Sequence, residues 1–393
     1  MGVSQSKETL LLDAASEGNV EQCKMLLQRG ANADASLSET QLGRSRTQRR
    51  GTYKKRTPLH ITAENGCVDL TKLLITHRAN VNAVDSNEST PLHYAASKRH
   101  GHISKLLILN GADVNAADKW CNTPLHYIAK YGLADVAKML IQNGADVNAV
   151  EEDRWTALHF TARWRRYNVA HLLIQNGADV NAKDKWSWVP LHYTAKWGHV
   201  DIAKLLMENG ADVNALDEWS STPLHYTAKW GHVDVAKLLM QNGADVNAVE
   251  KRKKTSLEYT VEYGHVGVAD VLIRNGADIS VLRRRDTLAL ICFGVQIDKK
   301  ALEYDRTGLL CEIQKRIDML RKGVLPTHHL YSSEELTFMW NLALSLTVKD
   351  KVIAFKAFYD TRYVRSLLLI ICLWHQGLVL VRKVFGLSYI NAN

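Results

Sequence analysis

A four-residue motif, Thr-Pro-Leu-His, recurs along this chain at a constant step of 33 residues. Exact copies, close variants and one degenerate copy begin at Thr57, Thr90, Thr123, Thr156, Val189, Thr222 and Thr255. A period of this length indicates a stack of similar supersecondary units rather than a globule built around one pocket. It therefore favours a long surface that holds another macromolecule over a catalytic site.

One repeat illustrates the expected local structure. Thr222 is a residue type that caps helices, and Pro223 suits the first helical position because its missing N–H would have no partner there. The apolar pattern predicts a helix at Leu224–Trp230 and a second at roughly Val233–Asn242, each followed by glycine. Neither reaches the roughly 12–15 residues that an isolated helix needs in water. Each unit must therefore bury its apolar face on its neighbours.

The stretch T-P-L-H-Y-T-A-K-W-G-H-V-D-V-A-K-L-L, with its ending G-A-D-V-N-A, resembles the ankyrin repeat. The resemblance extends from Thr9 to Leu282 and comprises about eight units. It implies a mainly α solenoid in which each repeat has two antiparallel helices and a β-hairpin finger. It also implies protein–protein binding on the concave side. A smaller helical C-terminal region follows the solenoid.

We expect five parts along the chain. They are an N-terminal segment (residues 1–8), a degenerate capping repeat (9–36), a basic insertion (37–56), seven repeats (57–282) and a helical C-terminal region of unassigned role (283–393). The insertion explains why the step from Thr9 to Thr57 is 15 residues longer than the others. Solenoids accept insertions in loops, so we expect an extended basic finger there. Its basic residues are Arg44, Arg46, Arg49, Arg50, Lys54, Lys55 and Arg56.

The composition narrows the class of protein. A formal net charge of +9 suits an acidic partner or an anionic membrane surface. Six cysteines without paired spacing, and no secretory signal, indicate reduced thiols in the cytoplasm. The sequence has no phosphate-cradling glycine loop, nucleophile elbow or metal-ligand cluster. We therefore expect a monomeric, non-catalytic protein without cofactor or metal, whose partner is another protein.

The histidine that ends each motif invites comparison with a metal ligand. These residues are His60, His93, His126, His159, His192 and His225. One histidine per repeat is too widely spaced to form a single metal site. The resemblance implies instead that each histidine bonds to the backbone and ties neighbouring repeats together.

Large aromatic residues follow five successive repeat starts by eight positions, and a cation precedes four of them. The resemblance places these residues in the concave groove, as an aromatic ladder edged by cations. The predicted groove residues are Lys130, Tyr131, Arg163, Trp164, Lys196, Trp197, Lys229, Trp230 and Tyr263. Trp, Tyr and Arg dominate binding hot spots, so we favour a contact surface here. A second aromatic set, four residues earlier on the same helix face, is interpreted as packing between repeats.

Five further tryptophans lie just before repeat starts. Trp120, Trp186 and Trp219 come three residues before the start, and Trp155 and Trp188 come one residue before it. The resemblance places all five in the polar turn at the fingertip. Because exposed tryptophan in a turn has little structural purpose, we predict that these side chains contact a partner.

A membrane-attached adaptor is an alternative. The chain start fits the pattern for N-myristoylation at Gly2, and the basic finger would supply the second signal that one acyl chain needs. The segment Leu367–Val381 is strongly apolar but shorter than the ~20 residues of a spanning helix. We favour a buried or interfacial helix over a membrane span for it. In this alternative the C-terminal region recruits a second factor.

Nucleic-acid binding through the basic finger is the other alternative. Basic residues interleaved with aromatic residues also describe such surfaces. However, no nucleic-acid-binding fold is recognisable, and acids recur through the array at Asp146, Asp179, Asp212 and Asp245. A nucleic-acid partner is therefore less favoured than a protein.

Overall fold

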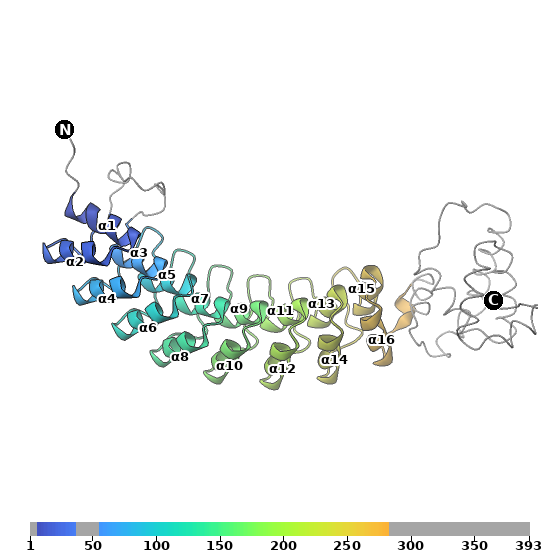
Figure 1. Ribbon diagram of the computed structural model, residues 1–393. Coiled ribbons are helices and arrows are strands. Elements are labelled where there is room, and N and C mark those ends of the chain that lie inside the picture. The colour runs from blue at the N-terminus through green and yellow to red at the C-terminus, as the bar shows by residue number, and fades with distance from the viewer. Residues whose placement is uncertain (1–5, 37–54, 283–393) are drawn as a thin grey trace, which may run out of the picture. The chain divides into compact units, whose positions relative to one another are not determined.

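The computed structural model describes residues 6–36 and 55–282 (Figure 1). The chain divides into two compact units, Met1–Ser256 and Leu257–Asn393. The predicted acylation position Gly2, the insertion residues from 37 to 54 and the C-terminal region with Leu367–Val381 lie outside the described residues. No helix within 6–36 and 55–282 is both long enough and apolar enough to cross a membrane.

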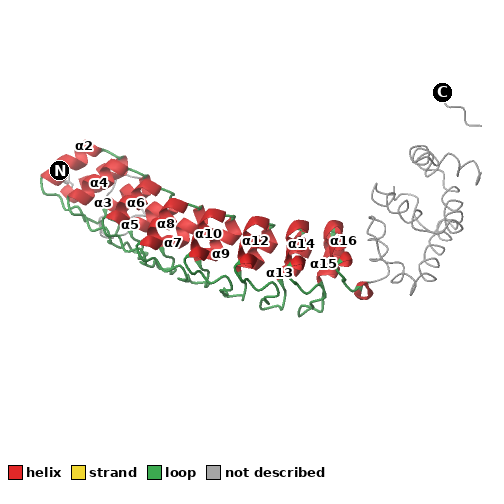
Figure 2. Ribbon diagram, turned by 90° about the horizontal axis from the view of Figure 1, so that it is seen from below, coloured by secondary structure: helices red, strands yellow, loops and turns green. Residues whose placement is uncertain are grey.

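Sixteen α-helices and one 3-10 turn make up the regular structure of the described residues. They are α1 (Lys7–Glu17), α2 (Val20–Gln28), α3 (Pro58–Asn65), α4 (Val68–Thr76), α5 (Pro91–Ser97), α6 (Gly101–Leu109), α7 (Pro124–Tyr131), α8 (Ala134–Gln142), α9 (Ala157–Trp164), α10 (Tyr167–Gln175), α11 (Pro190–Trp197), α12 (Val200–Glu208), α13 (Pro223–Trp230), α14 (Val233–Gln241), α15 (Ser256–Tyr263), α16 (Val266–Arg274) and η2 (Ile279–Val281). In the first unit, odd-numbered helices form one row and even-numbered helices a second (Figure 1). The loops between repeats run along the odd-numbered row (Figure 2).

The Thr-Pro-Leu-His motif fixes where each odd-numbered helix begins. At α13, Thr222 is the extended N-cap residue (φ −89°, ψ 166°) and Pro223 is the first helical residue. His225 completes a capping box, because its Nδ1 accepts a hydrogen bond from the backbone N–H of Thr222 (3.1 Å). Gly231 ends the helix with φ 79°, a left-handed conformation that glycine adopts without steric penalty.

Packing between repeats, rather than intrinsic helix stability, holds the array together. Helices α13 and α14 have 8 and 9 residues, and each agrees with its predicted bounds to within one residue. Helices of this length are marginal in isolation. Consecutive odd-numbered helices of the first unit pack on one another and on their even-numbered partners, and Leu224, Ala228 and Leu239 are fully buried. Burial of this small-and-large apolar set is the main favourable term.

The repeated histidines tie each repeat to the next. His159 accepts the Thr156 backbone N–H at Nδ1 (3.1 Å) and donates from Nε2 to the carbonyl oxygen of Trp188 (3.1 Å), 29 residues onward. These two bonds place the ring proton on Nε2. Burial lowers the pKa of four such rings to about 4, so they are neutral at physiological pH: His60, His126, His159 and His192. The structural interpretation of these histidines is confirmed.

An asparagine ladder forms a second set of ties near the ends of the even-numbered helices. Asn115 Nδ2 donates to the carbonyl oxygen of Gly144 (2.8 Å), and Asn115 Oδ1 accepts the backbone N–H of Asp146 (2.8 Å). The same pair of bonds recurs at Asn82, Asn148, Asn181 and Asn214. The Asp-Val-Asn part of each repeat ending therefore has a bonding role that explains its recurrence.

The β-hairpin fingers of the expected fold are not confirmed. In residues 6–36 and 55–282 there is no strand, and the one β-bridge joins Val249 to Thr255. Side-chain and backbone bonds together close the turn: Asp184 Oδ1 accepts the backbone N–H groups of Trp186 and Trp188, both at 2.8 Å, and Asp184 N–H donates to the Trp188 carbonyl oxygen (2.9 Å). Ser187, within this turn, has φ 60°, a left-handed conformation. Each finger joins the next through one backbone bond, such as Glu218 N–H to Trp186 oxygen (3.1 Å).

Candidate functional site

The last two residues of α7, α9, α11 and α13 are a cation followed by an aromatic residue. We call these eight residues the cation–aromatic row: Lys130, Tyr131, Arg163, Trp164, Lys196, Trp197, Lys229 and Trp230. The cations are half-buried, whereas Trp164, Trp197 and Trp230 are 44 %, 45 % and 49 % exposed. The row therefore presents ring surface to solvent and holds its charges between the rings.

Three of the four cations, Lys130, Arg163 and Lys196, lie near aromatic rings from two consecutive repeats. The Arg163 guanidinium carbon is 5.5 Å from the ring centre of Trp164, on its own helix, and 5.6 Å from that of Trp197, on the next. The same carbon is 5.6 Å from the ring centre of Trp155. These distances are within the range of cation–π attraction.

Lysines continue the same arrangement on either side of Arg163. Lys196 Nζ is 5.8 Å from the ring centres of both Trp197 and Trp230, and 5.2 Å from that of Trp188. Lys130 Nζ is 5.8 Å from Tyr131 and 5.9 Å from Trp164. Charges and rings thus alternate along α7, α9, α11 and α13.

Three cations of the row, Lys130, Arg163 and Lys196, lack a carboxylate partner among the described residues. Within residues 6–36 and 55–282, no carboxylate forms an ion pair with Lys130, Arg163 or Lys196. Burial lowers the pKa of Lys196, and the positive charges of Arg163 and Lys229 lower it further. The cations therefore repel one another, and an approaching negative charge would relieve that repulsion.

The backbone under the row is fixed by side chains from the following repeat. Arg166 Nε donates to the carbonyl oxygen of Lys130 (3.0 Å), and His232 Nε2 donates to that of Lys196 (3.0 Å). His199 makes the equivalent bond to Arg163 (3.2 Å). These donors satisfy helix-end carbonyls that otherwise lack a partner. The sequence interpretation missed this role, although the histidine that directly follows Gly198, Gly231 and Gly264 was a visible signal.

The fingertip placement of Trp155 and Trp188 is wrong. Trp188 is only 9 % exposed, and its ring centre lies 4.9 Å from Tyr193 and 4.4 Å from Tyr226. Trp155 lies 4.6 Å from Tyr193. The physical reason is that the chain has already returned from the tip by this position, so the ring packs against the odd-numbered helices. Each ring instead lies near a cation of the row: Trp155 near Arg163 and Trp188 near Lys196.

The other three finger tryptophans lie in the turn itself. Trp120 and Trp219 are 46 % and 42 % exposed, and Trp186 is half-buried with Lys185 Nζ 5.7 Å from its ring centre. Their backbones are held by neighbours, since Trp219 N–H donates to Asp217 Oδ1 (2.8 Å) and its carbonyl accepts from Lys251 (2.9 Å). These backbone bonds do not require a tryptophan side chain.

The second aromatic set, which lies four residues before the aromatic residues of the row, makes hydrogen bonds within the fold. Tyr193 donates to Asp184 Oδ2 at 2.6 Å, and Tyr127 and Tyr226 make the same bond to the aspartates of their own fingers. Burial raises the pKa of Tyr193, and the hydrogen bond to Asp184 raises it further. The interpretation of this set as packing is supported by these contacts.

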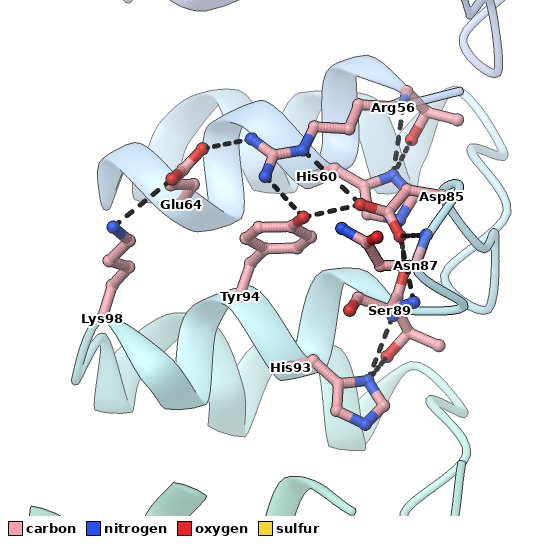
Figure 3. A network of polar contacts seen from close by, with 11 residues as sticks. Arg56, His60, Glu64, Asp85, Asn87, Ser89, His93, Tyr94 and Lys98 are labelled. Atoms are coloured by element: carbon pink, nitrogen blue, oxygen red, sulfur yellow. Dashed lines mark hydrogen bonds and ion pairs between the residues drawn. The ribbon is translucent and has the colours of Figure 1, made fainter. Parts of the chain in front are cut away.

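Arg56 does not belong to an extended basic finger. Its Nη1 lies 2.7 Å from Glu64 Oε2, its Nη2 donates to the Tyr94 hydroxyl, and its Nε lies 3.6 Å from Asp85 Oδ2 (Figure 3). Its guanidinium also lies over the Tyr94 ring at 4.2 Å, and Lys98 approaches Glu64 at 3.4 Å. We call these five residues the Arg56 network. Two carboxylates next to a half-buried arginine draw it into the fold, and that explains the difference from the prediction.

Two remaining predicted residues are described separately. Lys55 is exposed with φ 56°, directly before the Arg56 network. Tyr263 is 45 % exposed at the end of α15, in the second unit, and so is not part of the row as defined.

These features define a class of protein: a helical repeat solenoid with a capping motif, an asparagine ladder and a finger in each repeat. The chain belongs to the ankyrin-repeat family. The family model described as ankyrin repeats (3 copies) matches residues 11–118, 101–184 and 191–282. A comparison with curated proteins found no match.

Proposed function

We propose that this protein is a non-catalytic interaction scaffold that holds a protein partner on the cation–aromatic row. The observation that carries this proposal is the alternation of half-buried cations with Trp164, Trp197 and Trp230, which remain nearly half exposed. Large exposed rings in a contiguous line are uncommon unless something covers them. Ankyrin repeats generally mediate protein–protein binding, which agrees with this proposal.

The residue types and geometry of the row favour specific binding of a partner over nonspecific binding. Trp and Arg are the residue types most often found at binding hot spots, where a ring supplies area and a guanidinium supplies direction. The rings are already ordered by cations, and the cations by the backbone bonds beneath them. Such preorganisation lowers the entropy lost on binding.

The turn residues Trp120, Trp186 and Trp219 form a second strip for the same partner in this proposal. Their rings are exposed or half-buried beside the odd-numbered helices, and nothing in their backbone bonding requires an aromatic side chain. A partner lying along the row would meet them at its edge, where polar and aromatic contacts usually surround the central hot spot.

The test is a triple variant, Trp164→Ala, Trp197→Ala and Trp230→Ala, used as bait for capture from cytosol with mass spectrometry. The expected result is loss of the partners that the wild-type chain captures. The matched control removes similar apolar area outside the row, at the exposed residues Leu109, Tyr167 and Leu216. Circular dichroism checks that both variants are folded. Retention of every partner by the folded tryptophan variant would contradict the proposal.

A further inference from the structure

The Arg56 network shows how a carboxylate joins a cation that already lies over a ring. Arg56 sits 4.2 Å from the Tyr94 ring centre and still pairs with Glu64 at 2.7 Å. Glu64 also receives Lys98 from the next repeat. One carboxylate thus bridges cations of two neighbouring repeats without displacing the ring (Figure 3).

At Lys130, Arg163 and Lys196 the cation–aromatic row has the cations and rings of this arrangement without the carboxylates. Lys130, Arg163 and Lys196 each lie within 6 Å of rings from two repeats, and none pairs with a carboxylate of the described residues. Resting on the proposed scaffold function, we propose that the partner is an acidic linear segment whose Asp or Glu carboxylates bind Lys130, Arg163 and Lys196.

Charge favours an external acidic segment over the basic insertion of this chain. The insertion at residues 37–56 contains seven basic residues and one acid, Glu39, so the row would repel it. The mutual repulsion of Arg163, Lys196 and Lys229 points the same way, because added negative charge removes an unfavourable term.

The ring geometry favours a peptide over a single-stranded nucleic acid. Such strands bind by stacking bases on open aromatic faces. In the row, Trp164 has both Lys130 and Arg163 near its ring, and Trp197 has both Arg163 and Lys196. A stacking base would have to displace these cations, whereas a carboxylate binds them where they lie.

The spacing of the helices sets the spacing of the acids. Helices α7, α9, α11 and α13 pack directly on one another, and packed helices lie about 8–10 Å apart. A polyproline II chain repeats its face every three residues, which is about 9 Å. The best segment therefore carries an acid at every third position and adopts this extended conformation.

The experiment measures fluorescence anisotropy of two labelled peptides with the full chain. Both contain three glutamates among prolines and alanines, one with an acid at every third position and the other with the acids adjacent. We expect the spaced peptide to bind about tenfold more tightly, and salt to weaken it. Changing Lys130, Arg163 and Lys196 to Gln should reduce its affinity about tenfold or more. The control changes Lys105, Lys204 and Lys237 to Gln, an equal charge loss on the even-numbered helices.

Several outcomes overturn the inference. They are no binding of the spaced peptide at low salt, equal affinity for both peptides, or equal effects of the two sets of Gln substitutions. Tighter binding of a single-stranded oligonucleotide, lost in the same variant, would assign the row to nucleic acid. Partner capture separates this inference from the scaffold proposal: if the tryptophan variant loses partners that the Lys130, Arg163 and Lys196 variant keeps, the scaffold stands and the acidic segment fails. If both variants keep every partner, the scaffold fails.

Discussion

The Arg56 network and the cation–aromatic row occupy corresponding positions in different repeats but balance their charges differently. Glu64 is the penultimate residue of α3, as Lys130 is of α7, and Arg56 precedes Thr57 as Trp155 precedes Thr156. In the network each cation has a carboxylate within 4 Å. In the row, Lys130, Arg163 and Lys196 have ring faces and like charges instead. The first region pairs its charges within the fold, whereas the second, in our proposal, accepts an external anion.

Both regions are built on the same set of buried, repeated residues, which we call the frame. His60 and His159 make the same pair of backbone bonds, and Leu59 and Leu158 are both fully buried. The frame therefore does not dictate which residues stand at the helix ends. The proposed function places stability and recognition on different side chains, and the following predictions test that separation from the largest effect to the smallest.

Acidification should unfold both regions together. The ring pKa of His60 in the first region, and of His126, His159 and His192 in the second, is about 4, below the unfolded value of 6.5. Because the folded pKa is depressed, the stability from each neutral ring is complete above pH 6.5 and is lost as pH falls toward 4. We estimate a loss of about 3 kcal/mol per ring at pH 4, at about 1.4 kcal/mol per pH unit.

Two spectroscopic probes distinguish the regions in this titration. Eight of the ten tryptophans lie between Trp120 and Trp230, so their fluorescence reports mainly on the second region, while far-UV circular dichroism reports on all helices. A shared frame predicts coincident transitions between pH 6.5 and 4. Separate transitions, or undiminished stability at pH 4, would contradict a frame common to both regions.

Alanine at Gly66 or Gly198 should destabilise both regions by a similar amount, about 2 kcal/mol. Their φ values are 81° and 72°, where a side chain is strained, and an added Cβ would lie 2.7 Å from His100 and 2.5 Å from His232. Those histidines bond the carbonyls of Glu64 and Lys196. Urea unfolding measures the change.

The control for the glycine pair is Gly243→Ala. Gly243 has φ 86°, but nothing lies within 4 Å of an added Cβ. It should therefore lose only the strain energy, about 1 kcal/mol. A loss at Gly243 as large as that at Gly198 would show that the histidine contacts contribute nothing to the ends of the odd-numbered helices.

Glu64→Gln should destabilise the Arg56 network by about 1–2 kcal/mol. The Arg56 and Glu64 side chains are 11 % and 21 % exposed, so removing the carboxylate leaves a poorly solvated guanidinium with Asp85 as its nearest remaining carboxylate. The control is Glu208→Gln, which removes the exposed Lys204 pair and should change stability by less than about 0.5 kcal/mol. Equal effects in urea unfolding would remove the distinction between a structural and a surface charge pair.

The buried frame was well predicted because its residues recur in the sequence every 33 positions. Thr222, Pro223, His225 and Gly231 each act through local backbone geometry, so their roles can be inferred without knowing the packing. The row residues follow from the same register. The contacts of Arg163 and Lys196 with rings of the next repeat could not be inferred from the period, because they depend on how the repeats pack.

The misplaced residues depend on where the chain turns back. Trp188 was expected at a fingertip, but it directly follows Ser187, where the turn closes, and packs on Tyr226, 38 positions onward. Arg56 resembled its basic neighbours in sequence, yet its partners Asp85 and Tyr94 come from the following repeat. Composition shows the charge of a residue, whereas only the fold shows which partner reaches it.

Lys196→Gln should have the smallest effect on stability and a large effect on binding. The substitution removes attraction to the rings of Trp188, Trp197 and Trp230, worth about 0.5 kcal/mol each at such sites. It also removes repulsion from Arg163 and the loss of hydration that lowers the Lys196 pKa. We expect these terms to offset, leaving the free energy of unfolding within about 0.5 kcal/mol of wild type. Urea unfolding with tryptophan fluorescence measures the balance. A loss above about 1 kcal/mol in the free energy of unfolding would mean that the cations of the row stabilise the fold by their attraction to the rings. Both regions would then stabilise the fold, as Glu64 does by pairing with Arg56. They would differ only in the type of interaction.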